Sequence, residues 1–230
     1  MPARHCESAG GTTGRLSRGT LITLEGGEGA GKSTLCSALR ERLEREGYRP
    51  IATQEPAGTE LGRHVKAFFE EQARSGRDSI EPAAELFLFE AARAQHVREV
   101  IRTALERGDI VLCDRFTDST VAYQGYGRGL SLDQIEVCNQ LATGGLTPDL
   151  TLLLDLPPEG GLARARREAG RKDDSIGGES LEFHRRVRKG FLELAAKEPA
   201  RVKVLKADKA PQAVADEAWA WVRPLLHKPA

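Results

Sequence analysis

The chain has 230 residues, of which 40% are hydrophobic and 30% charged, and this is enough to bury one substantial α/β core. Lysine plus arginine and aspartate plus glutamate both number 34, so the formal net charge is zero and favours no nucleic-acid partner. No apolar run approaches the roughly 20 residues that a membrane-spanning helix needs, so we expect no membrane association.

Residues 1–18 are rich in glycine, serine, threonine and arginine, and Glu7 is their only acidic residue. This composition superficially resembles an organelle transit peptide, but three glycines disfavour the amphipathic helix of such a peptide. We therefore expect a disordered extension, followed by a single domain over residues 19–230.

The first predicted strand, Thr20–Glu25, leads into a glycine-rich turn and then into a helical stretch over Lys32–Glu46. The turn matches G-x-x-x-x-G-K-[ST], a spacing in which backbone N–H groups approach phosphate oxygens. Lys32 would supply charge for the β- and γ-phosphates and Ser33 a hydroxyl for Mg²⁺, while the alternative is a plain turn with an exposed lysine. The predicted ATP-binding residues are Gly26, Gly27, Glu28, Gly29, Ala30, Gly31, Lys32, Ser33 and Thr34.

The rest of the chain continues to alternate strands and helices. Further strands are predicted over Arg49–Thr53, Ile110–Cys113, Leu150–Asp155 and Val202–Lys206. Helices are predicted over Thr59–Gln72, Pro82–Arg107, Leu132–Ala142, Pro157–Glu168, Glu179–Lys197 and Gln212–Leu226. This alternation predicts an α/β three-layer P-loop fold, in which a five-stranded parallel sheet is flanked by helices and ligands bind beyond the carboxyl ends of the strands.

An acid and a base, Asp114 and Arg115, follow the third strand directly. Burying either of them alone would be costly, so they need charged partners. We interpret Arg115 as a ligand for a phosphate and Asp114 as support for the magnesium, its waters or the arginine. The alternative is a structural ion pair near the surface.

The cysteines are Cys6, Cys36, Cys113 and Cys138, and they contain no C-x-x-C pair. Scattered cysteines of this kind are typical of reduced residues, so we expect a cytoplasmic protein.

The segment DRFTDSTVAYQG, from Asp114 to Gly125, resembles the D-R-[YHF]-x-x-S-x-x-A-Y-Q-G segment of thymidylate kinases, the P-loop enzymes that phosphorylate dTMP. Four other segments resemble that family in the same order: EGGEGAGKST, QEPAGT, LFLFEAARAQH and TPDL. The resemblance extends from Gly19 to about Leu226. It implies ATP-dependent phosphorylation of dTMP to dTDP in dTTP biosynthesis, with Mg²⁺, in a homodimer formed through helices, for which Leu86–Leu105 is a candidate.

Phe89 and Arg93 match the thymine-binding pair of that family, and residues four apart share one face of a helix. The ring would stack on the pyrimidine and the guanidinium would bond its edge; the alternative is a core phenylalanine beside a solvated arginine. Thr120 and Tyr123 match family positions that contact the base and close over the deoxyribose. The alternative is that Thr120 only packs within a helix and that Tyr123 lies at the surface. The substrate-binding residues implied by the resemblance are Glu55, Phe89, Arg93, Arg115, Thr120, Tyr123 and Gln124.

Residues 161–178 are a candidate lid, because they concentrate basic residues between glycines that could serve as hinges. The alternative is a solvated charged helix followed by a loose loop. In thymidylate kinases with Glu-Gly-Ala in the phosphate loop, as in Glu28 to Ala30, the lid supplies the catalytic arginine. The resemblance therefore implies catalytic roles for Lys32, Arg115, Arg171 and Arg167, and metal-binding roles for Ser33 and Asp114.

The chain departs from the family pattern in two places. Gln54 and Ala57 replace an arginine and a glycine, and Asp174 to Gly177 lacks the arginine and glutamate of the usual D-R-x-E. These departures leave two alternatives: another deoxynucleoside monophosphate kinase, or a catalytically weakened nucleotide-binding paralogue. A GTPase is disfavoured, because Asn139 is the only asparagine and an N-K-x-D motif is impossible.

Overall fold

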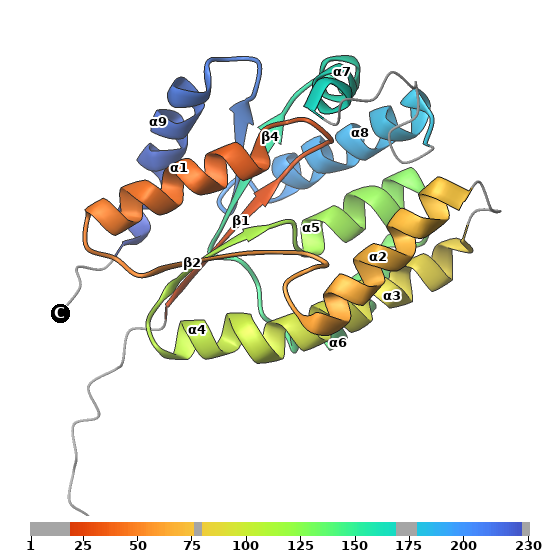
Figure 1. The fold of residues 1–230 in the computed structure, drawn as a ribbon, viewed down its shortest axis with the longest axis horizontal. Helices are drawn as coiled ribbons and strands as arrows, with labels where there is room; N and C mark the ends of the chain where they lie inside the picture. Colours follow the sequence, from red (N-terminus) through yellow and green to blue (C-terminus); the bar gives the residue numbers. More distant parts are fainter. Residues whose placement is uncertain (1–18, 76–79, 169–178, 227–230) are drawn as a thin grey trace, which may run out of the picture.

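A computed structural model of the chain describes residues 19–75, 80–168 and 179–226 (Figure 1). The predicted N-terminal extension lies outside these residues. Five parallel strands form one sheet in the order β2-β3-β1-β4-β5. Their bounds are β1 Thr20–Glu25, β2 Pro50–Gln54, β3 Ile110–Asp114, β4 Leu150–Asp155 and β5 Val202–Lys206. The predicted fold class is confirmed, and each strand boundary lies within one residue of its predicted position.

The helices also follow the predicted pattern, except over residues 117–127. The predicted helix over Pro82–Arg107 contains a π-helical stretch, η1 (Val97–Ile101). The α-helices of the described residues are α1 Lys32–Arg45, α2 Glu60–Ser75, α3 Pro82–His96, α4 Arg102–Glu106, α5 Thr117–Thr120, α6 Leu132–Thr143, α7 Pro158–Glu168, α8 Leu181–Lys197 and α9 Pro211–Val222, followed by the 3-10 turn η3 Arg223–Leu225.

The exception is the segment formed by α5 and the π-helix η2 (Val121–Gly127), where we predicted no helix. Its β-branched residues and two glycines have low helix propensity. Ala122 is nevertheless fully buried and packs with Phe183 and Val187 of α8. Tertiary packing therefore stabilises a helix that local sequence disfavours.

Helices cover both faces of the sheet (Figure 1). On one face, Leu39 of α1 and Trp219 of α9 pack against Leu112 and Leu152. On the other face, apolar residues of η1 and α4 cover β1 and β3, and those of α8 cover β4. The strands are therefore buried on both sides, as the near-continuous apolar strand sequences require.

The central strand β1 has β3 on one side and β4 on the other. The chain runs from β1 to β2 on one side and later from β3 past β1 to β4 on the other, so the strand order reverses here. In such sheets this switch point forms the ligand crevice beyond the carboxyl ends. The register pairs Leu24 with Asp114 and Glu25 with Leu153, so the ends of the three strands meet at one edge. The glycine-rich turn and the Asp114-Arg115 pair are thereby brought together.

A buried ion pair holds α5 to the turn that precedes β5. Arg201 donates to both carboxylate oxygens of Asp118, at 2.7 and 2.8 Å, and to the hydroxyl of Thr151 at 2.7 Å. Only 17% of the Arg201 side chain and 8% of the Asp118 side chain are exposed. Removing the arginine would leave a buried carboxylate without its counter-charge.

We expect Arg201→Met to lower the free energy of unfolding by about 3 kcal/mol, because breaking a buried pair from one side leaves the other charge uncompensated. Urea denaturation followed by circular dichroism measures this difference. Arg185→Met is the control, because its pair with Glu159 is about half exposed and such pairs contribute less than about 1 kcal/mol. Equal losses in the two variants would contradict the prediction.

Candidate functional site

The turn after β1 adopts a conformation that needs glycine. Gly26, Gly29 and Gly31 have φ angles of 139°, 64° and 92°, which side chains disfavour. A Cβ at Gly29 would also lie 2.1 Å from the carbonyl oxygen of Gly161 in α7. Glycine therefore lets the loop pack against α7 while leaving its amides free of side chains, as a phosphate-binding loop requires.

Lys32 opens α1, and its amino group lies over the loop. Nζ donates to the carbonyl oxygens of Gly26 and Gly27, at 3.1 and 2.9 Å. Burial, followed by the nearby Arg115, lowers the pKa of Lys32 to about 8. The first turn of α1 contains no acidic residue, so its N–H groups and partial positive charge remain available to an anion.

Arg115 also lies against the loop, in a left-handed backbone conformation with φ 71°. Its guanidinium donates to Glu28 at 2.9 Å, to the hydroxyls of Ser119 and Tyr123 at 3.2 Å each, and to the carbonyl of Gly26 at 3.3 Å. Arg115 holds the pKa of the Glu28 carboxyl below its ordinary value. The site thus places two cations, Lys32 and Arg115, against one glycine-rich loop, and both donate to the carbonyl oxygen of Gly26.

Glu25, the last residue of β1, positions the Arg115 segment and was not among the residues we predicted. Its fully buried carboxyl accepts from the N–H of Phe116 at 2.7 Å and from the hydroxyl of Ser119 at 2.6 Å. Burial, followed by the charge of Asp118, raises its pKa to about 8. A charged residue that closes an otherwise apolar strand was the sequence signal that could have identified it.

Ser33 and Asp114 come together at the start of α1. The hydroxyl of Ser33 donates to Asp114 at 3.0 Å, and the contact is exposed. Asp114 thus bonds to Ser33, and no ion pair joins it to Arg115 among the described residues, so the simple structural pair that we considered is wrong. One hydroxyl and one carboxylate fit Mg²⁺ that completes its coordination with phosphate and water. In the described ranges, no group of three or more His, Cys, Asp or Glu side chains could hold a metal unaided.

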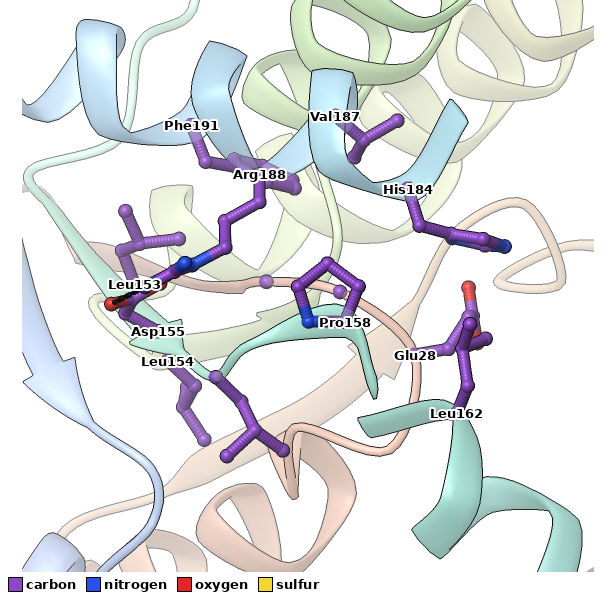
Figure 2. Close-up of a pocket in the computed structure, with 13 residues that line it drawn as sticks. Glu28, Leu153, Leu154, Asp155, Pro158, Leu162, His184, Val187, Arg188 and Phe191 are labelled. Carbon is purple, nitrogen blue, oxygen red and sulfur yellow. Dashed lines mark hydrogen bonds and ion pairs between the residues drawn. The ribbon is translucent and has the colours of Figure 1, made fainter. Parts of the chain in front are cut away.

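A small cavity of about 20 Å³ lies behind the loop, between β4, α7 and α8. Figure 2 shows His184 extending from α8 toward the carboxylate of Glu28, and Arg188 pairing with Asp155 nearby. Burial lowers the pKa of His184, which favours its neutral form. A cavity of this size cannot admit a nucleotide, so a nucleotide at this loop would bind outside it.

Arg93 is buried, with 2% of its side chain exposed, so the alternative of a solvated arginine is wrong. Nε donates to Glu55 at 2.8 Å, Nη1 to Glu90 and Asn139 at 2.5 and 2.8 Å, and Nη2 to the carbonyl of Phe116 at 3.2 Å. Four of its five N–H groups therefore have protein acceptors, and one Nη2 donor remains. Asn139 was missing from our prediction because only the folded chain brings α6 to α3. Glu90 was also missing, although its position three residues before Arg93 on the same helix is a signal that could have identified it.

The other predicted substrate residues lie around Arg93. Phe89 is half-buried and stacks on Phe69 of α2, with ring centroids 4.8 Å apart and planes 10° apart. Glu55 contacts His96 as well as Arg93. Thr120 and Gln124 are buried and lie one helical turn apart on the α5–η2 segment. Tyr123 reaches the loop instead, since its hydroxyl donates to Glu28 at 3.1 Å.

The candidate lid begins within α7. Arg164 donates to the carbonyl of Gly29 at 3.4 Å, whereas Arg167 is exposed and donates to the carbonyl of Ala163 at 3.4 Å. Gly161 was a predicted hinge, but it lies inside α7, where a Cβ would approach the carbonyl of Glu28 to 2.3 Å, so it is a close-packing residue. Arg171 and the second glycine hinge lie outside the described residues.

Several known proteins are similar to this chain over most of its length. The family described as thymidylate kinase matches residues 24–218. A thymidylate kinase of Synechococcus sp. (strain JA-3-3Ab) is 54% identical over 206 residues, which cover 90% of this chain and 96% of that protein. A thymidylate kinase of Deinococcus radiodurans is 50% identical over 207 residues, covering 90% and 98%. The crystal structure of thymidylate kinase from Ehrlichia chaffeensis superposes with a TM-score of 0.73 at 31% identity, covering 89% of this chain and 99% of that one.

Proposed function

Because this chain belongs to the thymidylate kinase family, we propose that the edge of the sheet around Lys32 and Arg115 is where ATP phosphorylates dTMP. The reaction is the ATP-dependent conversion of dTMP to dTDP. The observation that carries the assignment of the site is the pair of cations, buried Lys32 and partly buried Arg115, on one glycine-rich loop. Gly26–Thr34 would bind the triphosphate, and the cleft beside Phe89 and Arg93 the pyrimidine nucleotide.

The reaction needs positive charge and positioning more than it needs a base. The second pKa of a phosphate monoester is about 6, so dTMP is mostly a dianion at neutral pH and its oxygen can attack directly. The barrier lies in bringing two anions together and in stabilising charge on the transferred phosphoryl group. In our proposal Lys32 lies on the donor side and Arg115 on the acceptor side, with Arg167 or Arg171 arriving from the lid.

Both cations contact the protein itself in the described structure. Lys32 bonds loop carbonyls, and Arg115 pairs with Glu28 and Tyr123. A phosphate dianion carries more negative charge than a carboxylate or a carbonyl group, so it is the stronger acceptor for these donors. We infer that the monophosphate replaces Glu28 as the partner of Arg115. Tyr123 would then close over the sugar.

Mg²⁺ fits the same site, held by Ser33 and, directly or through water, by Asp114. When bound, it would neutralise charge on the phosphates of ATP. Ser33 and Asp114 are only two protein ligands, so we expect Mg²⁺ to bind together with the nucleotide and not alone.

The proposed substrate is tested by coupled measurement of ADP release with dTMP, dCMP and dGMP. We expect a strong preference for dTMP. Equal use of dCMP or dGMP would favour the alternative of another deoxynucleoside monophosphate kinase. Calorimetric binding of ATP and dTMP without ADP release would indicate a catalytically weakened paralogue.

We propose a cytoplasmic location. Cys36 and Cys113 are buried free thiols, and Cys138 is a free, partly exposed thiol, as expected in a reducing compartment. Among the described helices, none combines the length and hydropathy needed to cross a membrane.

We also propose a homodimer, through a face that includes Phe87 of the predicted stretch Leu86–Leu105. Within that stretch, Leu86, Ile101 and Leu105 are each less than 5% exposed and therefore lie inside the subunit. The neighbouring helices α2, α3 and α6 (Figure 1) carry six large apolar side chains that are exposed to solvent: Leu61, Phe68, Phe87, Leu132, Val137 and Leu141. A patch of this kind, here called the α2–α3–α6 patch, is typical of a subunit interface.

Leu141→Glu should convert the dimer to a monomer, because this side chain is 84% exposed in the single subunit and a charge there would be buried between subunits. Light scattering coupled to size exclusion measures the mass. Trp221→Glu is the control, since Trp221 is 44% exposed on α9, outside the α2–α3–α6 patch. A dimer that persists in Leu141→Glu would exclude the patch as the interface.

A further inference from the structure

One face of α3 lies along the α5–η2 segment, and polar contacts join the two at both ends. Arg93 donates to the carbonyl of Phe116 at one end, and Gln124 donates to Glu85 at the other. Glu85, Phe89 and Arg93 are spaced four residues apart and share this face. The ring proposed to stack on the pyrimidine is therefore bracketed by two polar groups.

The contact at the Gln124 end has a defined direction. The amide nitrogen of Gln124 lies 2.6 Å from Oε1 of Glu85, and both residues are buried. Arg128 pairs with the same carboxylate, through Nη2 to Oε2 at 2.9 Å. A carboxylate paired with arginine is ionised and can only accept hydrogen bonds. The NH₂ group of Gln124 must therefore face Glu85, and its carbonyl oxygen must face away.

Arg128 is itself held firmly, so Glu85 keeps its charge partner. Its Nη1 pairs with Glu179 at 2.6 Å, and its guanidinium lies 4.7 Å above the ring of Phe183. Within the described ranges, no group donates to the side-chain oxygen (Oε1) of Gln124, whereas its backbone carbonyl accepts from the N–H of Leu130. That oxygen is available as an acceptor for a ligand.

We propose that Glu85, held by Arg128, is a specificity-determining positioning residue that turns a hydrogen-bond acceptor of Gln124 toward the pyrimidine. The inference rests on the proposed function and identifies what selects the base. Thymine presents an N3–H donor and an O4 acceptor, whereas cytosine presents an N3 acceptor and an amino donor. The carbonyl of Gln124 and the remaining Nη2 donor of Arg93 match thymine. Cytosine would meet an acceptor with an acceptor and a donor with a donor.

Glu85→Gln tests the proposal, because it should reverse the amide of Gln124. In this variant the side-chain oxygen of residue 85 stays on Arg128, so the NH₂ group of residue 85 faces Gln124. Gln124 must then turn its oxygen toward residue 85 and its NH₂ group toward the base. We expect the ratio of kcat/KM for dTMP to that for dCMP to fall about 10- to 100-fold, since one base-reading contact discriminates by about 1–3 kcal/mol. Steady-state ADP release with each monophosphate gives this ratio.

Two further variants separate specificity from structure. Glu85→Asp keeps an acceptor-only carboxylate and should keep the dTMP preference. Glu193→Gln is the matched control, because Glu193 accepts from Tyr126 of the same η2 helix at 2.7 Å but does not contact Gln124. A purely structural role would lower the rates with both substrates equally and leave the ratio unchanged.

A folded Glu85→Gln protein with the wild-type ratio overturns the proposal. If that variant does not fold, Gln124→Leu is measured instead: a lowered ratio supports the proposal and an unchanged ratio overturns it. Wild-type protein that uses dCMP as well as dTMP contradicts both this inference and the proposed function. A wild-type preference for dTMP with no change in Glu85→Gln contradicts this inference alone.

Discussion

Lys32→Ala is expected to lower kcat by about 10³-fold, because removing one group that stabilises transition-state charge in a preorganised site typically costs 10²–10³-fold or more. Lys32 is the first residue of α1 and is held over the glycine-rich loop, where the triphosphate would lie. The KM for dTMP should change little, since Arg115 is retained. Coupled assay of ADP release measures both constants, and near-normal kcat would exclude Lys32 from the site.

The charge of Lys32, which we propose serves catalysis, should at the same time lower the stability of the folded protein. The pKa of Lys32 is lowered to about 8 in the folded protein, whereas an unfolded lysine has its ordinary value near 10.5. The folded state therefore disfavours the charge at pH 7, and this penalty disappears as pH rises from about 8 to above 10.5. Lys32→Met should raise the Tm at pH 7, with a gap to wild type that narrows across that window. A constant gap would mean that the charge is not the cause.

Arg115→Ala is expected to lower kcat/KM for dTMP by about 10³-fold while leaving the KM for ATP within about threefold of wild type, because one desolvated charge contact contributes about this much to transition-state binding. Arg115 is fixed by Glu28, Ser119 and Tyr123, and Tyr123 is the residue proposed to close over the sugar. Its guanidinium should therefore act on the acceptor phosphate. Steady-state kinetics with each substrate varied in turn measures the asymmetry.

Arg115→Lys is the informative companion variant. Lysine keeps the charge but cannot reproduce the planar fork that bonds several acceptors at once, so we expect it to recover only a small part of the lost kcat/KM. Full recovery would show that charge alone suffices at this position. An equal rise in KM for ATP in Arg115→Ala would place the residue on the donor side and contradict the assignment.

The predicted phosphate loop lies at the predicted edge of the sheet, as expected. The loop and the strands are local features of the sequence, and the parallel arrangement of the strands brings them together. Strands of apolar residues, a G-x-x-x-x-G-K-S spacing and a helix that follows it can each be recognised within about 15 residues of sequence. Parallel strands then place their carboxyl ends together, so Asp114 and Arg115 were expected beside the loop, where the structure has them.

The roles of the charged residues were harder to predict. Asp114 and Arg115 are neighbours in sequence, yet one bonds Ser33 and the other Glu28. Arg93 was expected to face the base, and the fold surrounds it with acceptors from three other segments, Glu55, Phe116 and Asn139. Which partner an arginine chooses depends on distances between elements far apart in the chain, and no local pattern encodes them.

Residue types, spacing and alternation were thus sufficient for the fold class, the strand boundaries and the phosphate loop, because each depends on interactions within one element or between adjacent ones. Packing between distant elements decided the helix over Thr117–Gly127, the buried role of Glu25 and the fixed amide of Gln124. These features arise where burial makes an unpaired polar group costly, so each side chain takes the partner that long-range packing brings within reach.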